Sequence, residues 1–426
     1  MLWEMMNDEN RCQKIVERSV EKNINPKWIS VFYNSQIRNL VYGRIREGTY
    51  KIFPPHIGLI PKENGEMRQV YINEPIDRIM LMIINDCLFD AFPEMIHPNC
   101  VSYQKGIGTQ MVIKKISRRL SKIEEIAIRD GDVKERIGVK MDFSKYFDNV
   151  SIECIDGIFE KMKSKLPKDE HCIIDYLSKY YHQDWYFDEN NELRKKYQGL
   201  KQGCAVASFL ACAIPYDYDV YMSNKYKVYY RYSDDVIVLD SENSKVESET
   251  RKIMGRYGVS LNPKKVESIY YDKWIKFLGF ELKGSKITLS PARFRNFEST
   301  ILELTRDRKR KSAFKSVIRW MYLGEHSWAS TCLSTINCES DINEMEKFVK
   351  DAINSSEFKY RKLGRLHTNL TKKDGILFRD KGEKIHKYRK HWLEGYYTMQ
   401  CMRNSLTYNK QLFECLGREM MRLESL

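Results

Sequence analysis

The 426-residue sequence contains no long hydrophobic run. Its longest mostly apolar stretch, Cys204 to Pro215, is too short to cross a bilayer. The first ten residues carry acidic side chains and no basic segment, so we expect no secretory signal there. These absences predict a protein without membrane association and favour a cytoplasmic location.

The sequence also lacks cysteine pairs at the spacing of a metal site or a disulfide framework. The 11 cysteines are scattered, and none forms a Cys-x-x-Cys pair, so neither a zinc ribbon nor a disulfide framework is indicated. His367, His386 and His391 show no metal-ligand spacing. Internal repeats and low-complexity tracts are absent. The cysteine pattern indicates a reducing compartment. The length of 426 residues is enough for two or three domains.

Acidic residues are outnumbered by basic ones. The 72 Lys and Arg against 58 Asp and Glu give a net charge of +14. Such a balance favours a polyanionic partner, and nucleic acid is the usual one. The 27 tyrosines include candidates for stacking on bases, although most belong to the core or the general surface.

One acidic pair needs a special reason. Asp234 and Asp235 lie between Val228–Arg231 and Val236–Leu239, which are rich in β-branched and aromatic residues and therefore read as two strands. The polar residues between them predict a tight hairpin turn. Adjacent like charges repel, so the pair marks either a solvated turn or a site for a divalent cation.

A second acidic strand favours the cation site. Ile137, Val139 and Met141 alternate along a half-buried strand that ends in Asp142. A strand ending in Asp beside the acidic hairpin can hold two metal ions about 3.5–4 Å apart, the arrangement for in-line phosphoryl transfer. The backbone carbonyl of Phe143 is a candidate for a further oxygen ligand.

At this point the chain resembles the reverse transcriptases. Four segments carry the resemblance, in the family's order and over about residues 51–290: Asp142–Asp148, Gly199-Leu200-Lys201-Gln202-Gly203, Tyr232–Asp235 and Phe277–Phe280. Lys201 stands where the family usually has Pro, and we expect it to add a charge near the template. A fifth segment, Ser102–Gly106, is similar to the family's Ser-Tyr-Gly-Phe-Arg, with Lys105 expected to face template or phosphate.

The resemblance implies an α+β right-hand polymerase with fingers, palm and thumb and an antiparallel palm sheet. We expect an N-terminal extension over residues 1–50 and fingers and palm over 51–290. A helical thumb and C-terminal RNA-binding region would occupy 291–426, including the basic, aromatic stretch Lys381–His391.

The resemblance also implies the reacting groups. Asp142, Asp234 and Asp235 would hold two Mg²⁺ ions, with Mn²⁺ as an alternative, together with the carbonyl of Phe143. Lys265, in Asn262-Pro263-Lys264-Lys265, matches a residue proposed to protonate the pyrophosphate leaving group. Lys264 is its rival for that role, and a simple basic turn is the plain alternative for both.

Nucleotide-binding residues follow from the same likeness. Lys62 and Arg68 match basic positions used on the incoming triphosphate, although both could be ordinary hairpin charges. Phe147 occupies the sugar-gate position, where a ring would exclude a ribose 2′-OH and favour deoxynucleotides. Gln202 lies between glycines that let the backbone approach template and nucleotide.

A primer grip completes the implied machinery. Phe277, Leu278 and Gly279 would hold the primer end against the metals. Trp274–Leu282 and Lys286–Leu289 are expected as strands, and helical patterns dominate after residue 290.

The predicted function is therefore RNA-directed DNA synthesis. The partners would be dNTPs, an RNA template and the cDNA product. The chain is most similar to the bacterial defence-associated reverse transcriptases, several of which copy a non-coding RNA encoded beside them. Retron, diversity-generating and group II intron-like enzymes are the alternatives within the family. A catalytically idle RNA-binding scaffold and an RNA-dependent RNA polymerase are the alternatives outside it.

Overall fold

The computed structural model describes residues 1–21, 24–61, 66–131, 136–239, 245–324 and 327–360, together with positions 399, 402, 403, 406, 417 and 418. These residues form two compact units. The first unit comprises Met1–Gly108 and Lys134–Tyr270, and the second comprises Thr109–Val133 and Tyr271–Leu426. The expected functional boundaries at residues 50 and 290 stay predictions. Lys62 and the Lys381–His391 stretch lie outside the described residues.

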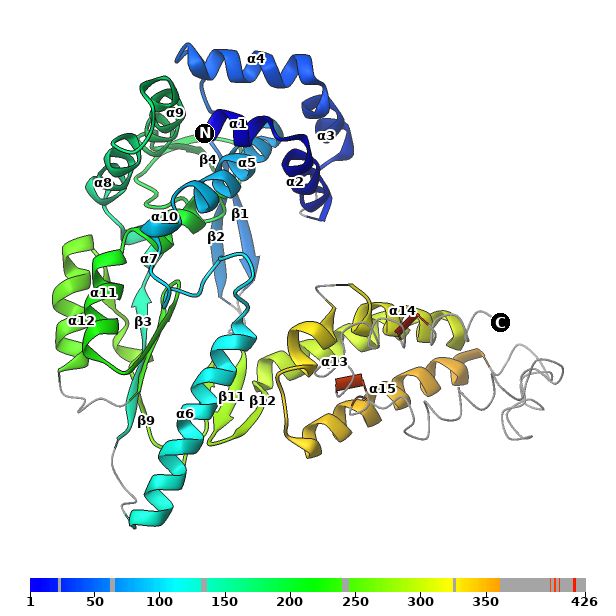
Figure 1. Ribbon diagram of the computed structural model, residues 1–426. Helices are drawn as coiled ribbons and strands as arrows, with labels where there is room; N and C mark the ends of the chain where they lie inside the picture. Colours follow the sequence, from blue (N-terminus) through cyan, green and yellow to red (C-terminus); the bar gives the residue numbers. More distant parts are fainter. Residues whose placement is uncertain are drawn as a thin grey trace. The chain divides into compact units, whose positions relative to one another are not determined.

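Four helices open the first unit: α1 (Leu2–Asn7), α2 (Glu9–Glu21), α3 (Pro26–Tyr33) and α4 (Ser35–Arg46). The side chains of Asn25 and Asn34 cap α3 and α4 by accepting hydrogen bonds from backbone N–H groups. Helices α1, α2 and α3 pack on the long, largely buried helix α5 (Pro75–Ala91), which is followed by the single turn η1 (Pro93–Met95) (Figure 1).

A four-stranded sheet lies next along the chain. Strands β1 (His56–Pro61) and β2 (Met67–Ile72) form an antiparallel hairpin, with Gly58 opposite Val70. Strand β4 (Trp185–Phe187) joins β1 in parallel and pairs with β5 (Leu193–Lys195), which gives the order β2-β1-β4-β5.

The central sheet of the first unit is antiparallel. Its order is β6 (Val228–Tyr232), β7 (Asp235–Leu239), β3 (Gly138–Ser144), β8 (Ser260–Leu261), and β9 (Glu267–Ile269) also pairs with β3. Val139 and Met141 are fully buried, as the alternation of β3 predicted. Helices α11 (Tyr216–Lys225) and α12 (Val246–Met254) pack against this sheet, and η3 (Gly255–Tyr257) and η4 (Pro263–Lys265) border β8.

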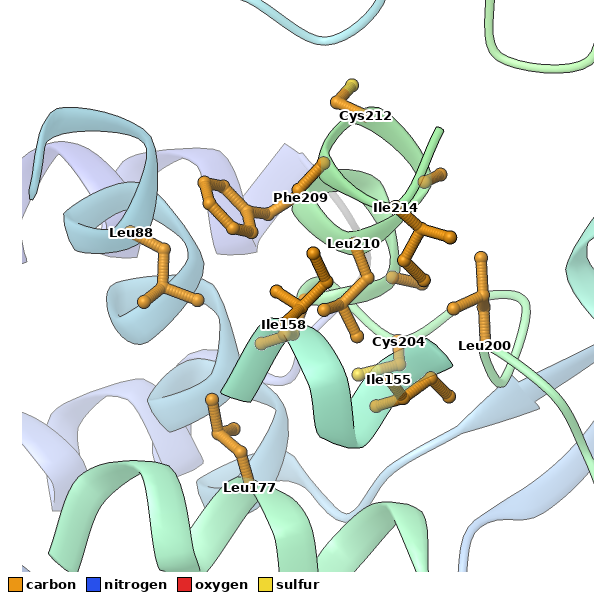
Figure 2. Packing of buried hydrophobic residues seen from close by; sticks show 14 of the residues in the cluster. Leu88, Ile155, Ile158, Leu177, Leu200, Cys204, Phe209, Leu210, Cys212 and Ile214 are labelled. Atoms are coloured by element: carbon orange, nitrogen blue, oxygen red, sulfur yellow. The ribbon is translucent and has the colours of Figure 1, made fainter. Parts of the chain in front are cut away.

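The core of the first unit gathers helices around α10 (Ala207–Ala213), which is buried along its length. Figure 2 shows Leu210 of α10 among Ile155 and Ile158 of α8 (Ile152–Lys163), with Leu177 of α9 (His171–Tyr181) and Leu88 nearby. Cys204 and Cys212 are buried free thiols. The turns α7 (Tyr146–Asn149) and η2 (Lys168–Glu170) connect these elements. Burial of this apolar surface gives the loop that precedes α10 a rigid support.

The second unit combines a three-stranded sheet with helices. Its strands β10 (Ile275–Phe277), β11 (Phe280–Lys283) and β12 (Lys286–Leu289) are antiparallel. The predicted strand Trp274–Leu282 is therefore interrupted, because Leu278 and Gly279 adopt positive φ angles of 50° and 79° and turn the chain. Helix α6 (Thr109–Asp130) packs on β11, where the Ser117 hydroxyl donates to the Gly284 carbonyl at 2.9 Å.

Three helices of the second unit pack on one another: α13 (Pro291–Thr305), α14 (Arg310–Tyr322) and α15 (Glu339–Tyr360) (Figure 1). The π-helical turn η5 (Ala329–Leu333) precedes α15. Phe297, Trp320 and Trp328 form an aromatic cluster with ring centroids 4.7–6.3 Å apart. Within the described ranges, no helix has both the length and the apolar surface that crossing a membrane requires. The protein is of the α+β class with antiparallel sheets, as the sequence predicted.

Candidate active site

Neighbouring strands of the central sheet bring three carboxylates together. Asp142 on β3 lies directly opposite Asp235 on β7 in the antiparallel register. The backbone N–H of Phe143 donates to the carbonyl of Asp234 at 3.0 Å. The turn itself requires a positive φ of 56° at Ser233. The three acids predicted from the sequence therefore lie together at the end of strands β3 and β7 that adjoins the hairpin turn.

Three ionised carboxylates at this end of the sheet would repel one another. Burial, followed by the charges of Asp234 and Asp142, raises the pKa of Asp235 to about 6. Burial and the Asp142 charge likewise raise the pKa of Asp234. The three carboxylates are therefore incompletely neutralised, and a cation bound there would relieve the repulsion.

The donor atoms fit a hard divalent cation, because Mg²⁺ binds carboxylate oxygens and completes its shell with water and substrate phosphates. In the part of the chain that the structure describes, no three Asp, Glu, His or Cys side chains are already grouped closely enough to hold a metal ion by themselves. Asp142, Asp234 and Asp235 would therefore supply only part of the coordination shell of a metal ion. The side chain of the adjoining Phe143 is buried.

Lys265 supplies positive charge beside these acids. Its ammonium donates to Oδ2 of Asp142 at 2.7 Å. Although burial lowers it, the hydrogen bond and charge of Asp142 raise the pKa of Lys265 overall. The preceding Asn262 fixes the turn, since its N–H donates to the Asp142 carbonyl at 2.8 Å and its side chain accepts from the N–H of Lys264. Of the two rival lysines, Lys265 is thus the one in contact with an acid of the site.

A buried ion pair lies behind the hairpin, and the sequence analysis missed it. The guanidinium of Arg231 binds both carboxylate oxygens of Asp219 at 2.7 Å, and both side chains are fully buried. Arg231 also donates to the carbonyl of Ser233 at 3.1 Å, which ties the pair to the hairpin turn. The hydroxyl of Tyr229 donates to Asp219 at 2.5 Å. An arginine within an otherwise apolar strand was the available signal.

The loop Gly199–Gly203 connects two other parts of the site. The N–H of Leu200 donates to the carbonyl of Phe147 at 2.7 Å, and the carbonyl of Gln202 accepts from the N–H of Tyr71 at 2.6 Å. Gly199 has a φ of +55°, and a Cβ there would lie 2.1 Å from the Phe147 carbonyl oxygen. Only glycine permits this close approach.

Lys201 does not face a template, contrary to the expectation from the sequence. It is 1% exposed, and its ammonium donates to the carbonyl of Gln183 at 2.5 Å and to Oε1 of Gln198 at 3.1 Å. The same ammonium lies 4.8 Å from the ring centroid of Tyr180. Burial lowers the pKa of Lys201 to about 8. The backbone of Lys201 is left-handed, with a φ of +53°.

The remaining nucleotide-binding candidates are placed as follows. Phe147 is half-buried, with its ring edge against Tyr146 at 5.6 Å between centroids. Arg68 is exposed on β2, and its charge acts on Asp234, so the two groups are near each other. Lys62 lies outside the described residues. Phe277, Leu278 and Gly279 form the β10–β11 turn of the second unit.

Asp142, Asp234, Asp235 and the loops beside them form the candidate site. Comparison with known families then identifies the chain: residues 60–282 match the model of the reverse transcriptase (RNA-dependent DNA polymerase) family. This match covers more than half of the sequence, so the chain belongs to that family. Its right-hand fold is the one expected from the sequence.

Two solved structures to which the chain is similar are distant from it in sequence. The chain is 11% identical to a telomerase from Candida albicans in complex with a fragment of telomeric RNA, with a TM-score of 0.40, covering 84% of this chain and 68% of that one. It is 14% identical to the apo telomerase from Candida tropicalis, with a TM-score of 0.44, covering 88% and 68%. At such values the likeness carries no functional argument. No curated protein matches the sequence.

Proposed function

We propose that the protein is an RNA-directed DNA polymerase, a nucleotidyltransferase acting through its three clustered carboxylates. The observation that carries the proposal is the pairing of Asp142 with Asp235 across β3 and β7, with Asp234 beside them, in a chain of this family. Charges that repel at the edge of a basic protein have a clear use if a divalent cation binds there. A scaffold that only bound RNA would have no need of them.

Two Mg²⁺ ions, or Mn²⁺, held by Asp142, Asp234, Asp235 and the carbonyl of Phe143, would lower the pKa of the attacking hydroxyl and stabilise the leaving oxygens. The primer 3′-hydroxyl would give its proton to water, its oxygen would form a bond to the α-phosphorus of a dNTP, the bond from that phosphorus to the bridging oxygen would break, and pyrophosphate would leave. Lys265 would donate a proton to the pyrophosphate.

The surrounding residues would select the substrate. Arg68, with Lys62, would hold the triphosphate through charge-assisted hydrogen bonds. The ring of Phe147 would meet a ribose 2′-OH. The hydrogen bond from the Leu200 N–H to the Phe147 carbonyl holds the backbone that carries this ring. Gln202 would approach the nucleotide and its template base. Phe277–Gly279, in the second unit, would grip the primer.

The direct test is extension of a DNA primer on an RNA template with dNTPs in Mg²⁺ or Mn²⁺. The protein should incorporate dNTPs in preference to NTPs, and Asp234→Asn should lower the rate at least about 10³-fold because it removes charge from the metal site. Asp217→Asn, an exposed acid on α11, is the matched control and should leave the rate unchanged. No incorporation by the wild type with either metal, or an active Asp234→Asn, would refute the proposal.

The role of Lys265 has its own control in the neighbouring lysine. Lys265→Gln should lower the rate of a single incorporation roughly 10²-fold, because a general acid contributes about that much, and the loss should shrink with an analogue that has a better leaving group. Lys264→Gln removes an exposed lysine from the same turn and should have little effect. Equal effects of the two substitutions would mean that the turn acts only through its charge.

The biological role that we propose is cytoplasmic anti-phage defence in bacteria, through cDNA synthesis on a dedicated non-coding RNA. The resemblance of the sequence to defence-associated reverse transcriptases supports it. The test is to purify the protein from cells with and without phage and to sequence the bound RNA and DNA, beside an Asp234→Ala/Asp235→Ala double variant. One discrete RNA in both proteins, with complementary DNA in the wild type alone, would support the proposal.

Other outcomes of that experiment point elsewhere. DNA joined to its own template RNA would indicate a retron-type enzyme, and intron RNA would indicate a group II intron-like one. DNA unrelated to any bound RNA would mean untemplated synthesis. The absence of DNA in every sample would favour an RNA-binding scaffold.

A further inference from the structure

Tyr103 is a strained and exposed tyrosine in the first unit. Its φ is +59°, in the left-handed region that bulky L-residues rarely adopt. Its side chain is also open to solvent, with 44% of the residue exposed. Backbone strain of this kind persists only where the surrounding structure imposes it, and it gathers at functional sites.

The segment before Tyr103 is fixed to the catalytic hairpin. It runs parallel to β6, where the N–H of Arg231 donates to the carbonyl of Asn99 and the N–H of Val101 donates to the carbonyl of Arg231, both at 2.9 Å. Ser102 is fully buried, and its hydroxyl contacts the thiol of Cys212 at 3.4 Å. The chain therefore enters Tyr103 in a set position beside strand β6.

The segment after Tyr103 is fixed as well. The side-chain amide of Gln104 donates back to the carbonyl of Cys100. The ammonium of Lys105 pairs with Asp86 at 3.0 Å and with Asp90 at 2.9 Å. Lys105 therefore binds acids of this chain, whereas the sequence analysis expected it to face template or phosphate. With both flanks held, Tyr103 cannot relax out of its strained conformation.

The ring of Tyr103 lies against the first residue of the acidic hairpin. Its centroid is 6.1 Å from that of Tyr232, at an interplanar angle of 39°. Ser233 follows at once, and its side chain is buried beside the Tyr103 hydroxyl: burial raises the pKa of Tyr103, and a hydrogen bond with Ser233 opposes that rise. Two aromatic rings and a buried hydroxyl thus adjoin Asp234.

We propose that Tyr103 stacks on the terminal nucleotide of the primer, with Tyr232 as the second ring of the same stacking surface. The inference rests on the proposed function, because the strand that must end at the carboxylates is the one that supplies the attacking hydroxyl. Aromatic rings bind bases of any sequence through their faces. The pinned flanks hold the ring ready, so little ordering is needed when the strand binds.

The experiment uses a DNA primer with 2-aminopurine at its 3′ end, annealed to an RNA template, because this base loses fluorescence when it stacks. The variants are Tyr103→Phe, Tyr103→Ala and Tyr103→Gly. The matched control is Tyr221→Ala, which removes a tyrosine of similar exposure (38%) from α11. Binding, quenching, the KM for dNTP and the melting temperature are measured for each protein.

Tyr103→Phe should behave as the wild type. Tyr103→Ala and Tyr103→Gly should bind the primer at least about fivefold more weakly, the lower limit for the loss of one stacked base, with reduced quenching and an unchanged KM for dNTP. Tyr103→Gly should melt at a higher temperature than Tyr103→Ala, because glycine adopts a positive φ freely and alanine does not. Tyr221→Ala should bind as the wild type does.

Normal primer binding by both Tyr103→Ala and Tyr103→Gly would overturn the inference, and so would an effect confined to the KM for dNTP. A lower melting temperature for Tyr103→Gly than for Tyr103→Ala would remove the argument from strain. Failure of the proposed function has a different signature: the wild type would then extend no primer, whereas quenching still reports whether Tyr103 stacks.

Discussion

Two sets of charges on either side of the acidic hairpin are treated in opposite ways. Behind the hairpin, the charges of Arg231 and Asp219 are fully buried and neutralise each other through two hydrogen bonds of 2.7 Å. At its tip, burial and the Asp142 charge raise the pKa of Asp234, and burial with the charges of Asp234 and Asp142 raises the pKa of Asp235. Arg231 and Asp219 hold the turn in place, whereas the charges of the three carboxylates are incompletely neutralised.

The difference separates structural from functional electrostatics. A buried pair with all its partners fixes a conformation, although a well-packed apolar pair could match its stability. Repelling carboxylates destabilise the fold and are retained for what they bind. The neighbouring Lys201 belongs to the first kind, since its buried ammonium is satisfied by Gln183, Gln198 and the Tyr180 ring.

The largest effect on stability should come from breaking the buried pair. Arg231→Met leaves the carboxylate of Asp219 buried without its cation and frees the carbonyl of Ser233, so the free energy of unfolding should fall by about 3–5 kcal/mol. Urea denaturation measures the change. The double variant Arg231→Met/Asp219→Leu, which removes both charges, should recover more than half of the loss. If it is no more stable than the single variant, the pair does not act through charge.

A second effect concerns the family residue that Lys201 replaces. Proline is usual at this position, yet Lys201→Pro should lower the free energy of unfolding by about 3 kcal/mol. Proline cannot adopt the φ of +53°, and it lacks the N–H that Lys201 donates to the Gln198 carbonyl at 2.9 Å.

The control for Lys201→Pro is Lys201→Gly, which loses the same ammonium contacts but fits the backbone. It should be the more stable of the two in thermal melts, whatever the cost of losing the ammonium. A proline variant as stable as the wild type would mean that the loop readily takes the family's usual conformation.

Much of the central sheet was predictable because its signals are local. Val139 and Met141 alternate with polar positions along β3, and the β-branched runs on either side of Ser233 specify a hairpin. The burial of one sheet face then sets the register that places Asp142 opposite Asp235. The resemblance to the family added the order of the motifs.

The features that were not predicted depend on partners elsewhere in the chain. Arg231 is buried only because Asp219 on α11 meets it, and a single charge in a strand pattern does not name its partner. Lys201 is buried because Gln183, Gln198 and Tyr180 meet its ammonium, and residue type alone does not predict these contacts. Tyr103 is strained because contacts on both sides of it hold the chain.

The smallest expected effect has the opposite sign to the first. Without metal, Asp235→Asn should raise the free energy of unfolding at pH 7 by about 1–2 kcal/mol. A carboxyl whose pKa is raised from 3.8 to about 6 is penalised by up to about 3 kcal/mol when ionised, and partial exposure reduces this figure. Because the folded state binds the proton more tightly than the unfolded state, the penalty is present above pH 6 and is lost as the pH falls towards 4.

The stability gained from Asp235→Asn should therefore be largest at pH 7 and should disappear near pH 4, which denaturation in EDTA across that range measures. Added Mg²⁺ should stabilise the wild type more than Asp235→Asn, because the cation binds the folded site. Lys140→Gln is a useful control, since the charge of Lys140 opposes the raised pKa of Asp235. If Asp235→Asn destabilises the metal-free protein at pH 7, the carboxylates at the tip are already compensated and the contrast with Arg231 and Asp219 fails.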